Sequence, residues 1–254
     1  SDTSGTVTVS NNIALTGTSA QIAAAVDDVD TFSGTPTATL GDAHTLAELK
    51  AINNALSGTL TLNDYTVALS GSAADIKAAL AGTFASAYTG NVTISDANGS
   101  GIAAADINTI AGATSGTVTV TNNINITGNS DVIATAVGNV NTFSGTPTAT
   151  LGDAHTLAEL KAINNKLTGT LTLNDYTVAL NGSSADVAAA LAGSFADTYT
   201  GTATLNDNHS LAQLVAINNG TSGNITLNSN AVALTGSTSD VKAALAGNVG
   251  ASYS

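Results

Sequence analysis

The stretch TFSGTPTATLGDAHTLAELKAINNALSGTLTLNDYTVALS, residues 31–70, decides the fold, because it returns 111 positions later as residues 142–181 with only three changes. Ala55 becomes Lys166, Ser57 becomes Thr168 and Ser70 becomes Asn181. Near-identity over such a long block indicates internal duplication, and self-similarity at a fixed period is typical of repeat proteins. We therefore interpret the chain as an array of repeated units.

A shorter unit lies within this block and begins with Ser or Thr, then Gly, then an alternating run typical of a strand. We expect a first repeat block at 1–111, a second at 112–221 and a partial third at 222–254, all in one continuous solenoid, because repeat units pack only against their neighbours. The unit starts lie 22 to 32 residues apart, at Ser4, Ser33, Ser57, Thr89, Ser115, Ser144, Thr168, Thr200 and Ser222.

Two kinds of unit alternate along the array. In the first kind, Thr59 and Thr61 alternate with Leu60 and Leu62 as in a half-buried strand, and Tyr65–Leu69 predicts a second strand. A helix follows, marked by a capping residue with an acid or amide three positions later. These pairs are Thr18 and Gln21, Ser72 and Asp75, Ser183 and Asp186, and Ser237 and Asp240.

The second kind runs directly from one strand into a helix. Thr45 and Glu48 have the spacing of a capping box. The apolar stripe of this helix is Leu46, Leu49 and Ile52, repeated as Leu157, Leu160 and Ile163 and as Leu211, Leu214 and Ile217. Three Asn pairs follow these helices and predict hydrogen-bonded ladders between units: Asn53-Asn54, Asn164-Asn165 and Asn218-Asn219.

One strand and one short helix cannot bury their own apolar face, so neighbouring units must stack to close a core. The sequence therefore predicts an α/β fold, a repetitive solenoid of strand–helix units with a parallel sheet on one face. A β-solenoid with short helices is the alternative.

Composition excludes several classes of function. Only 9% of residues are charged, with five Lys and Arg against eighteen Asp and Glu, for a net charge of −13. Such a surface repels phosphate backbones, so we expect no nucleic-acid partner. The chain has no Cys, which excludes a disulfide framework and a thiolate metal site. No apolar run approaches the ~20 residues of a membrane span, and because the chain begins with Ser1 rather than Met we expect a processed product.

The stretch from Thr89 up to Ser115 is four residues longer than its counterpart from Thr200 up to Ser222. The added length holds a D-x-N-x-S-G sequence that resembles the opening of a calcium loop. The acid expected at position 12 is missing, because position 12 is Ile107. Calcium is thus one prediction, and an Asx-rich turn that caps the next helix without metal is the other. The candidate ligands are Asp96, Asn98, Ser100 and Asp106.

Three histidines each follow an aspartate by two residues, and a His beside an acid can act as a general base. Catalytic groups converge from different elements, however, whereas this arrangement recurs along the array. We therefore interpret the histidines as capping or surface groups and expect no enzyme. The three pairs are Asp42 and His44, Asp153 and His155, and Asp207 and His209. Phe84 with Tyr88, and Phe195 with Tyr199, predict a stacked core ladder.

Threonines that alternate with apolar residues in the strands predict a flat, hydroxyl-rich surface if equivalent strands stack. Such a surface could bind ice or a surface glycan. Its predicted members are Thr6, Thr8, Thr59, Thr61, Thr117, Thr119, Thr170 and Thr172.

The recurring phrases TLAELKAINN, SLAQLVAINN, SGTLTL and ALSGSAADIKAALAG resemble repeats of very large extracellular cyanobacterial proteins, often associated with hemolysin-type calcium-binding proteins. The glycine-rich nonapeptide of that calcium-binding class is absent, so its calcium-driven folding is not implied. The resemblance implies an extracellular or cell-surface structural or adhesive protein, whose copies join end to end into a fibre or surface layer. Ice or glycan binding is the alternative function.

Overall fold

A computed structural model describes residues 5–250, 252 and 253 of the chain. These residues divide into two compact units. The first unit holds the described residues up to Ala97, together with Asp106–Asn122 and Asn139–Ser144. The second holds Asn98–Ala105, Asn123–Gly138 and the described residues from Gly145 onward. Both units combine short helices with parallel strands, which confirms the predicted α/β class.

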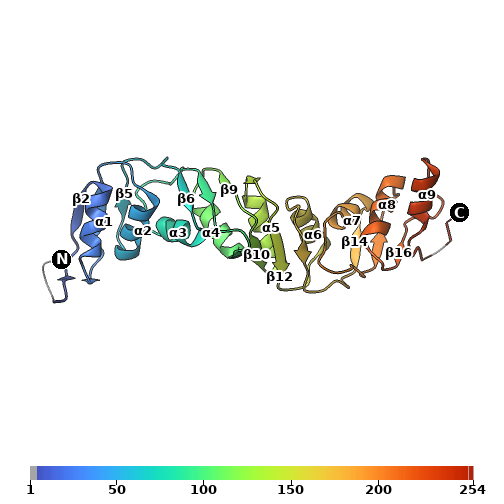
Figure 1. The fold of residues 1–254 in the computed structure, drawn as a ribbon, viewed down its shortest axis with the longest axis horizontal. Helices are drawn as coiled ribbons and strands as arrows, with labels where there is room; N and C mark the ends of the chain where they lie inside the picture. Colours follow the sequence, from blue (N-terminus) through green and yellow to red (C-terminus); the bar gives the residue numbers. More distant parts are fainter. Residues whose placement is uncertain (1–4, 251, 254) are drawn as a thin grey trace. The chain divides into compact units, whose positions relative to one another are not determined.

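The described residues of the first unit form three parallel sheets, and Figure 1 shows their strands among the helices. The smallest pairs β1 (Thr8–Val9) with β3 (Thr31–Phe32). The others, in spatial order, are β2 (Ala14–Gly17), β4 (Thr37–Leu40) and β5 (Leu60–Thr61), and then β6 (Leu69–Gly71), β7 (Val92–Ile94), β9 (Val118–Val120) and β11 (Thr142–Phe143).

The described residues of the second unit form two parallel sheets. In spatial order they are β8 (Gly101–Ala103), β10 (Asn125–Gly128), β12 (Thr148–Leu151) and β13 (Leu171–Thr172), and then β14 (Leu180–Gly182), β15 (Ala203–Leu205) and β16 (Ile225–Thr226).

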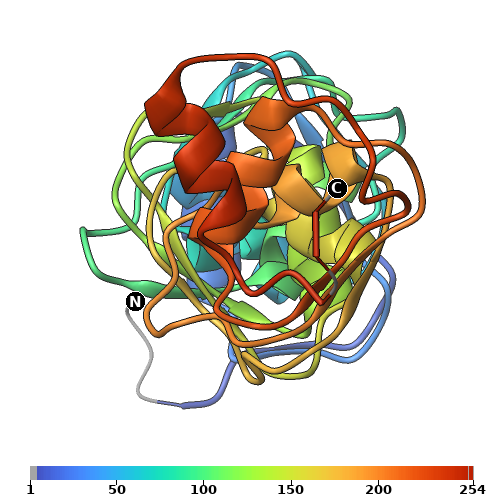
Figure 2. The same cartoon turned by 90° about the vertical axis from the view of Figure 1, so that its right-hand side faces the viewer.

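Nine short helices lie within the described part of the chain, and most return the chain from one parallel strand to the next. From α6 to α9, consecutive helices of the second unit pack side by side, as α8 and α9 do in Figure 2. The helices are α1 (Ser19–Asp27), α2 (Leu46–Ala55), α3 (Ala73–Leu80), α4 (Ala104–Ala113), α5 (Ser130–Asn139), α6 (Leu157–Asn164), α7 (Ser184–Ala190), α8 (Leu211–Gly220) and α9 (Thr238–Leu245).

In each repeat that has two strands, the two strands belong to different sheets. β5 is the last strand of one sheet, whereas β6, only eight residues further on, is the first strand of the next. The duplicated β13 and β14 make the same change in the second unit. A single sheet on one face, as expected from the sequence, is therefore replaced by several sheets. The second strand also begins later than predicted, at Leu69 rather than Tyr65, because residues 65–68 form a turn and an extended approach.

The predicted helix starts are confirmed. The Thr45 side chain accepts a hydrogen bond from the Glu48 N–H, and the Glu48 carboxylate accepts one from the Thr45 N–H. Together these bonds satisfy two of the backbone donors that a helix start leaves unpaired. The Thr45 N–H and the other donors around this carboxylate also lower the pKa of Glu48. The remaining predicted caps form as well, at Thr18, Ser72, Ser183 and Ser237.

Alternation in the sequence correctly predicts the core. Leu60 and Leu62 are buried, whereas Thr59 and Thr61 are exposed. In α2, Leu49 and Ile52 are fully buried and Leu46 is half-buried, so the predicted stripe faces inward. Full burial of a Leu or Ile side chain stabilises the fold by about 1.5–3 kcal/mol.

Only one residue of each predicted Asn pair links neighbouring helices. Asn53, Asn164 and Asn218 donate hydrogen bonds to the carbonyls of Ala79, Ala190 and Ala244, each of which lies in the last turn of the next helix. These asparagines lie in the last turn of α2, α6 and α8 rather than after it. The amides thus join helices pairwise and do not form a continuous ladder.

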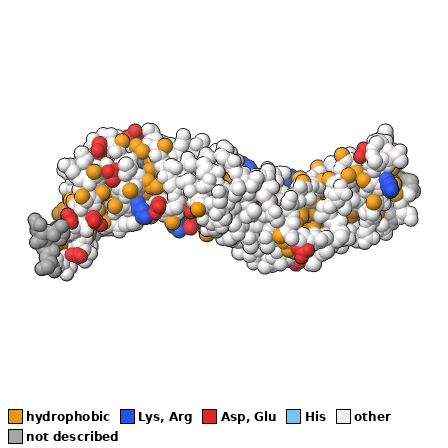
Figure 3. All heavy atoms as spheres, viewed as in Figure 1, with side chains coloured by type: hydrophobic (Ala, Val, Ile, Leu, Met, Phe, Trp, Pro, Cys, Tyr) orange, Lys and Arg blue, Asp and Glu red, His pale blue; other side chains and the backbone are white. Residues whose placement is uncertain are grey.

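Acidic side chains are scattered over the face seen in Figure 3, among uncharged ones. Three lysines form ion pairs with acids of the next helix: Lys50 with Asp75, Lys77 with Asp106 and Lys161 with Asp186, each with Nζ 2.5 Å from Oδ1. The Lys50 ammonium lowers the pKa of the Asp75 carboxyl. Such solvent-exposed pairs contribute little to stability.

Candidate functional site

The threonine pairs predicted to form one surface are divided among four sheets. One threonine of each pair lies in a strand and the other precedes that strand, and none of the four strands, β1, β5, β9 and β13, is hydrogen-bonded to another. These pairs therefore do not stack on one another. Each strand pairs with strands of the neighbouring repeats. The prediction instead paired equivalent strands of repeats that are further apart in the sequence. The pairs are Thr6 and Thr8, Thr59 and Thr61, Thr117 and Thr119, and Thr170 and Thr172.

A two-row group of threonines nevertheless forms on β2, β4 and β5, and we call it the threonine array. Thr16, Thr39 and Thr61 lie directly opposite one another on the three strands. Since Ala38 faces Leu60, Thr37 and Thr59 form a second row beside the first. All five threonines are exposed. Neighbouring rungs are separated by about 4.8 Å across strands and about 6.6 Å along a strand.

The corresponding threonines of the second unit are less open. Thr127, Thr150 and Thr172 lie opposite one another on β10, β12 and β13. The Asn125 side chain forms a hydrogen bond with the Thr150 hydroxyl at 3.1 Å and accepts one from the Thr148 hydroxyl at 3.2 Å. The first unit has Ala14 at the position equivalent to Asn125. Ala14 has no such groups, so hydroxyls of the threonine array are available to solvent.

The three histidines are buried, not at the surface as expected. His44 and His155 are 3% exposed and His209 is 2% exposed. Each Nε2 lies within hydrogen-bond distance of a tyrosine hydroxyl 44 residues later: 3.1 Å to Tyr88, 2.9 Å to Tyr199 and 3.1 Å to Tyr253. The caps of the following helices are instead Thr45, Thr156 and Ser210.

The hydrogen bonds of the tyrosine determine the histidine tautomer. The Tyr88 hydroxyl donates its single proton to the Val67 carbonyl at 2.6 Å, so its oxygen accepts a hydrogen bond from Nε2–H of His44. The Nδ1 atom of His44 is then unprotonated, and it is buried without a partner. Burial lowers the pKa of His44, which keeps the ring neutral. Nε2 of this imidazole is occupied and Nδ1 is enclosed, so neither nitrogen is placed to exchange protons with a substrate.

The aromatic pairs form part of the same clusters. The rings of Phe84 and Tyr88 lie 5.9 Å apart, and those of Phe195 and Tyr199 lie 5.6 Å apart. Tyr88 and Tyr199 are each 2% exposed. The predicted core position is confirmed for the two tyrosines, whereas Phe84 and Phe195 are half-buried, and among the described aromatic residues each pairs only with its own tyrosine. His44 and His155 are additional members that the sequence interpretation missed.

The four candidate calcium ligands each have a separate structural contact. Asp96 accepts a hydrogen bond from the Ala73 N–H at 2.7 Å, and Asp106 pairs with Lys77. In the second unit, Asn98 accepts a bond from the Asn123 N–H at 2.9 Å, and the Ser100 carbonyl accepts one from Asn125. Among the residues that the structure describes, no three His, Cys, Asp or Glu side chains gather to hold a metal ion. Calcium stays a prediction from the loop sequence.

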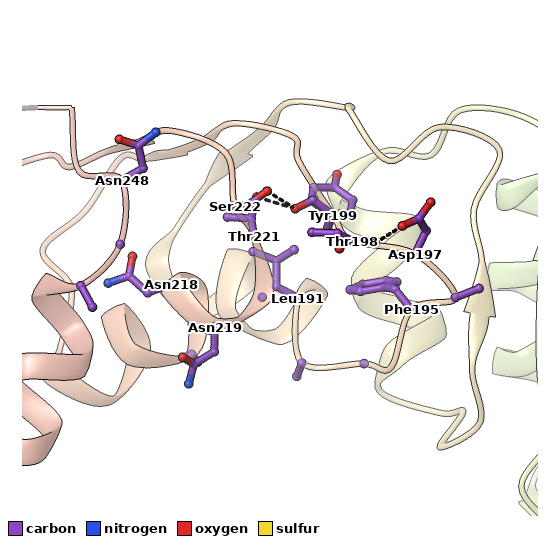
Figure 4. A pocket seen from close by; sticks show the side chains of 17 residues that line it. Leu191, Phe195, Asp197, Thr198, Tyr199, Asn218, Asn219, Thr221, Ser222 and Asn248 are labelled. Atoms are coloured by element: carbon purple, nitrogen blue, oxygen red, sulfur yellow. Dashed lines mark hydrogen bonds between the residues drawn. The ribbon is translucent and has the colours of Figure 1, made fainter.

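An open groove of ≈ 1040 Å³ lies in the second unit between the ends of α7 and α8 and the segments that follow them. Figure 4 shows Phe195, Tyr199, Thr221 and Asn218 around it. The Thr221 hydroxyl donates to the Gly201 carbonyl at 2.7 Å, and the Ser222 hydroxyl lies 3.4 Å from the Tyr199 carbonyl. Asp197 supplies the single acidic side chain of the lining. The lining residues therefore include no nucleophile paired with a base.

Comparison with family models, with curated proteins and with solved structures finds no match for this chain. None of the described helices combines the length and apolar character needed to cross a membrane. The chemistry of its own residues is thus the basis for a functional proposal.

Proposed function

We propose that this chain is a non-enzymatic structural or adhesive repeat protein, in which the strand–helix units stack as a solenoid and copies join end to end. The repeated hydrogen bonding carries the proposal. The Gly41 N–H bonds to the Gly17 carbonyl at 2.8 Å, and 111 residues later the Gly152 N–H bonds to the Gly128 carbonyl at 2.8 Å. The duplicated sequences thus make the same contact with the preceding strand–helix repeat, once in each compact unit.

The use of polar side chains for internal contacts also supports a structural role. Buried histidines bond to tyrosines, amides of Asn53 and Asn164 join successive helices, and Asp42 and Asp153 accept bonds from the N–H groups that start α1 and α5. Groups that could perform acid–base chemistry are therefore committed to holding the fold. We expect hydrolysis assays to detect no activity.

An extracellular or cell-surface location is supported by the resemblance to large extracellular cyanobacterial repeats. Low charge density with net charge −13 and many short polar side chains also suit a long assembly that must remain soluble. The predicted blocks at 1–111, 112–221 and 222–254 describe the duplication history, and other copies of the chain are the proposed partners.

Assembly is tested by sedimentation velocity over a wide concentration range, with electron microscopy of the same samples. We expect the mean mass to grow with concentration and filaments to appear. A single sedimenting species with the mass of one chain at the highest concentration, without filaments, would refute end-to-end assembly.

The threonine array favours a second candidate function, binding to ice or to a glycan. Its two rows of exposed hydroxyls repeat at regular intervals, so they could match a regular lattice of water or sugar hydroxyls. Thermal hysteresis measurements test ice binding, and glycan array measurements test sugar binding. We expect Thr39→Lys in the array to abolish either activity, whereas Thr150→Lys at the equivalent, partly occupied site leaves it intact. Absence of both activities in the parent protein excludes this candidate.

A further inference from the structure

The groove in the second unit is lined by segments from three successive repeats. These segments are residues 191–199, 216–222 and 246–248, and three glycines and four alanines are among the lining residues. Such short side chains leave the space between the segments unfilled. The volume of ≈ 1040 Å³ is comparable with that of the largest small-molecule sites, which occupy about 300–1,000 Å³. The groove is therefore large enough to hold a ligand of more than one ring.

The groove has an aromatic side and an amide side. Figure 4 shows the rings of Phe195 and Tyr199 on one side of Thr221, and the side chains of Asn218 and Asn248 on the other. Tyr199 is 2% exposed, whereas Phe195 is half-buried. Phe195 therefore offers the aromatic surface that a ligand can reach.

Three polar side chains of the lining contribute little to the fold. The Asp197 carboxylate is exposed and accepts a 2.7 Å hydrogen bond from the N–H of the next residue, Thr198. The side chains of Asn219 and Asn248 are also exposed, and neither forms a hydrogen bond within the described part of the chain. These three groups thus keep their hydrogen-bonding capacity for a ligand.

The first unit repeats part of the same arrangement without these groups. The Thr221 hydroxyl donates to the Gly201 carbonyl at 2.7 Å, and the equivalent Thr114 hydroxyl donates to the Gly90 carbonyl at 2.7 Å. The contact that closes the groove is thus duplicated, but the polar lining is not. Asp197 corresponds to Ser86, Thr198 to Ala87 and Asn219 to Gly112. The second unit therefore carries longer hydrogen-bonding side chains at positions where the fold does not require them.

The composition of the lining indicates which class of ligand fits. It contains one acid and no Lys, Arg or His, and the chain has a net charge of −13, so an anionic ligand is repelled. Amide groups both donate and accept hydrogen bonds, as sugar hydroxyls do. The C–H groups of a sugar ring pack on the electron-rich face of an aromatic ring. The two sides of the groove together match a neutral saccharide, whose rings combine an apolar face with hydroxylated edges.

We infer that this groove binds a neutral oligosaccharide. One sugar ring packs on Phe195 and donates hydroxyl hydrogen bonds to the Asp197 carboxylate, and a neighbouring sugar exchanges hydrogen bonds with the Asn219 amide. The site is separate from the threonine array. It goes beyond the proposed end-to-end assembly, because it gives the protein a specific contact to carbohydrate.

The ligand class is tested with the full chain on an array of neutral gluco-, galacto- and manno-oligosaccharides next to sialylated and uronic-acid glycans. We expect binding to the neutral oligosaccharides only. Isothermal titration calorimetry with the neutral oligosaccharide that binds best then gives the affinity. Absence of binding to every neutral glycan, or stronger binding to the acidic ones, overturns the inference.

Three substitutions test the residues of the site. Asp197→Ser installs the first-unit residue, Asn219→Ala removes the amide, and Phe195→Leu removes the ring while it keeps the apolar bulk. We expect each to weaken binding by about tenfold or more, with unchanged circular dichroism. Asn165→Ala and Phe84→Leu are the matched controls, because Asn165 is the equivalent exposed amide at the end of α6 and Phe84 is the equivalent half-buried ring of the first unit. Equal losses from the controls overturn the site.

Nuclear magnetic resonance gives a readout that depends on no variant. On titration with the same oligosaccharide, we expect the side-chain amide signals of Asn219 to shift and those of Asn165 to stay in place; no shift at Asn219 overturns the site. Thr39→Lys separates the groove from the threonine array, and we expect it to leave this binding unchanged. If Thr39→Lys removes binding while the three groove variants retain it, the sugar binds to the threonine array and the groove inference is wrong.

Discussion

Replacing Tyr88 by Phe tests whether the buried histidine–tyrosine contacts stabilise the packing of neighbouring strand–helix repeats within the first compact unit. The hydroxyl removed donates to the Val67 carbonyl and accepts from Nε2 of His44, and the tyrosine is 2% exposed. Its loss leaves one buried donor and one buried acceptor unpaired, each worth about 1–3 kcal/mol. Allowing for the easier burial of Phe, we expect the free energy of unfolding to fall by about 2–4 kcal/mol.

The chain supplies its own comparison series for this substitution. Tyr199→Phe should cost as much as Tyr88→Phe, because Tyr199 bonds to His155 and Val178 with the same geometry and the same burial. Tyr253→Phe should cost less than about 1 kcal/mol, since Tyr253 is only half-buried and water can replace the hydroxyl. Urea unfolding followed by circular dichroism measures all three. A cost below about 0.5 kcal/mol for Tyr88→Phe, or equal costs at positions 88 and 253, refutes the reasoning.

Three further predictions follow from other contacts. Acidification should lower the urea concentration at the unfolding midpoint once the pH falls below about 6.5, the ordinary pKa of histidine. Burial lowers the pKa of His44 and His155, so in that range the unfolded chain binds more protons than the folded one. A midpoint that rises on acidification contradicts this. Asp207→Ala should cost about 1 kcal/mol, because the Ser184 N–H at the start of α7 loses its acceptor, while Asp197→Ala, at an exposed position, should be neutral in the same unfolding measurement. The calcium prediction requires that calcium raise the melting temperature of the parent and not that of Asp96→Asn; identical melting curves with calcium and with chelator exclude it.

Local features were predictable because short-range sequence determines them. The spacing of Thr45 and Glu48 specifies the start of α2, and the alternation around Leu60 specifies which side chains are buried. Sheet order depends instead on which strands become neighbours after the chain turns between Leu60 and Leu69, and no periodicity in the sequence encodes that change. The sequence therefore did not predict that Thr16, Thr39 and Thr61 lie opposite one another on neighbouring strands.

The burial of the histidines was missed although the sequence held a signal. A short polar group before a helix looks like a cap, so the Asp-x-His pattern was interpreted locally. Each His has a Tyr 44 residues later, and this constant interval, at His44, His155 and His209, indicates a contact between distant positions. A search for residue pairs at a fixed separation would have found it.

The tyrosine oxygens have a consequence for mechanical behaviour. At Tyr88, a single oxygen contacts groups 21 and 44 residues earlier in the chain, so it joins three separate segments of the chain. Simple linear arrays break one module at a time under tension, because each module touches only the next. A chain joined in this way should instead yield in larger cooperative steps, with an extension per step that corresponds to more than one module.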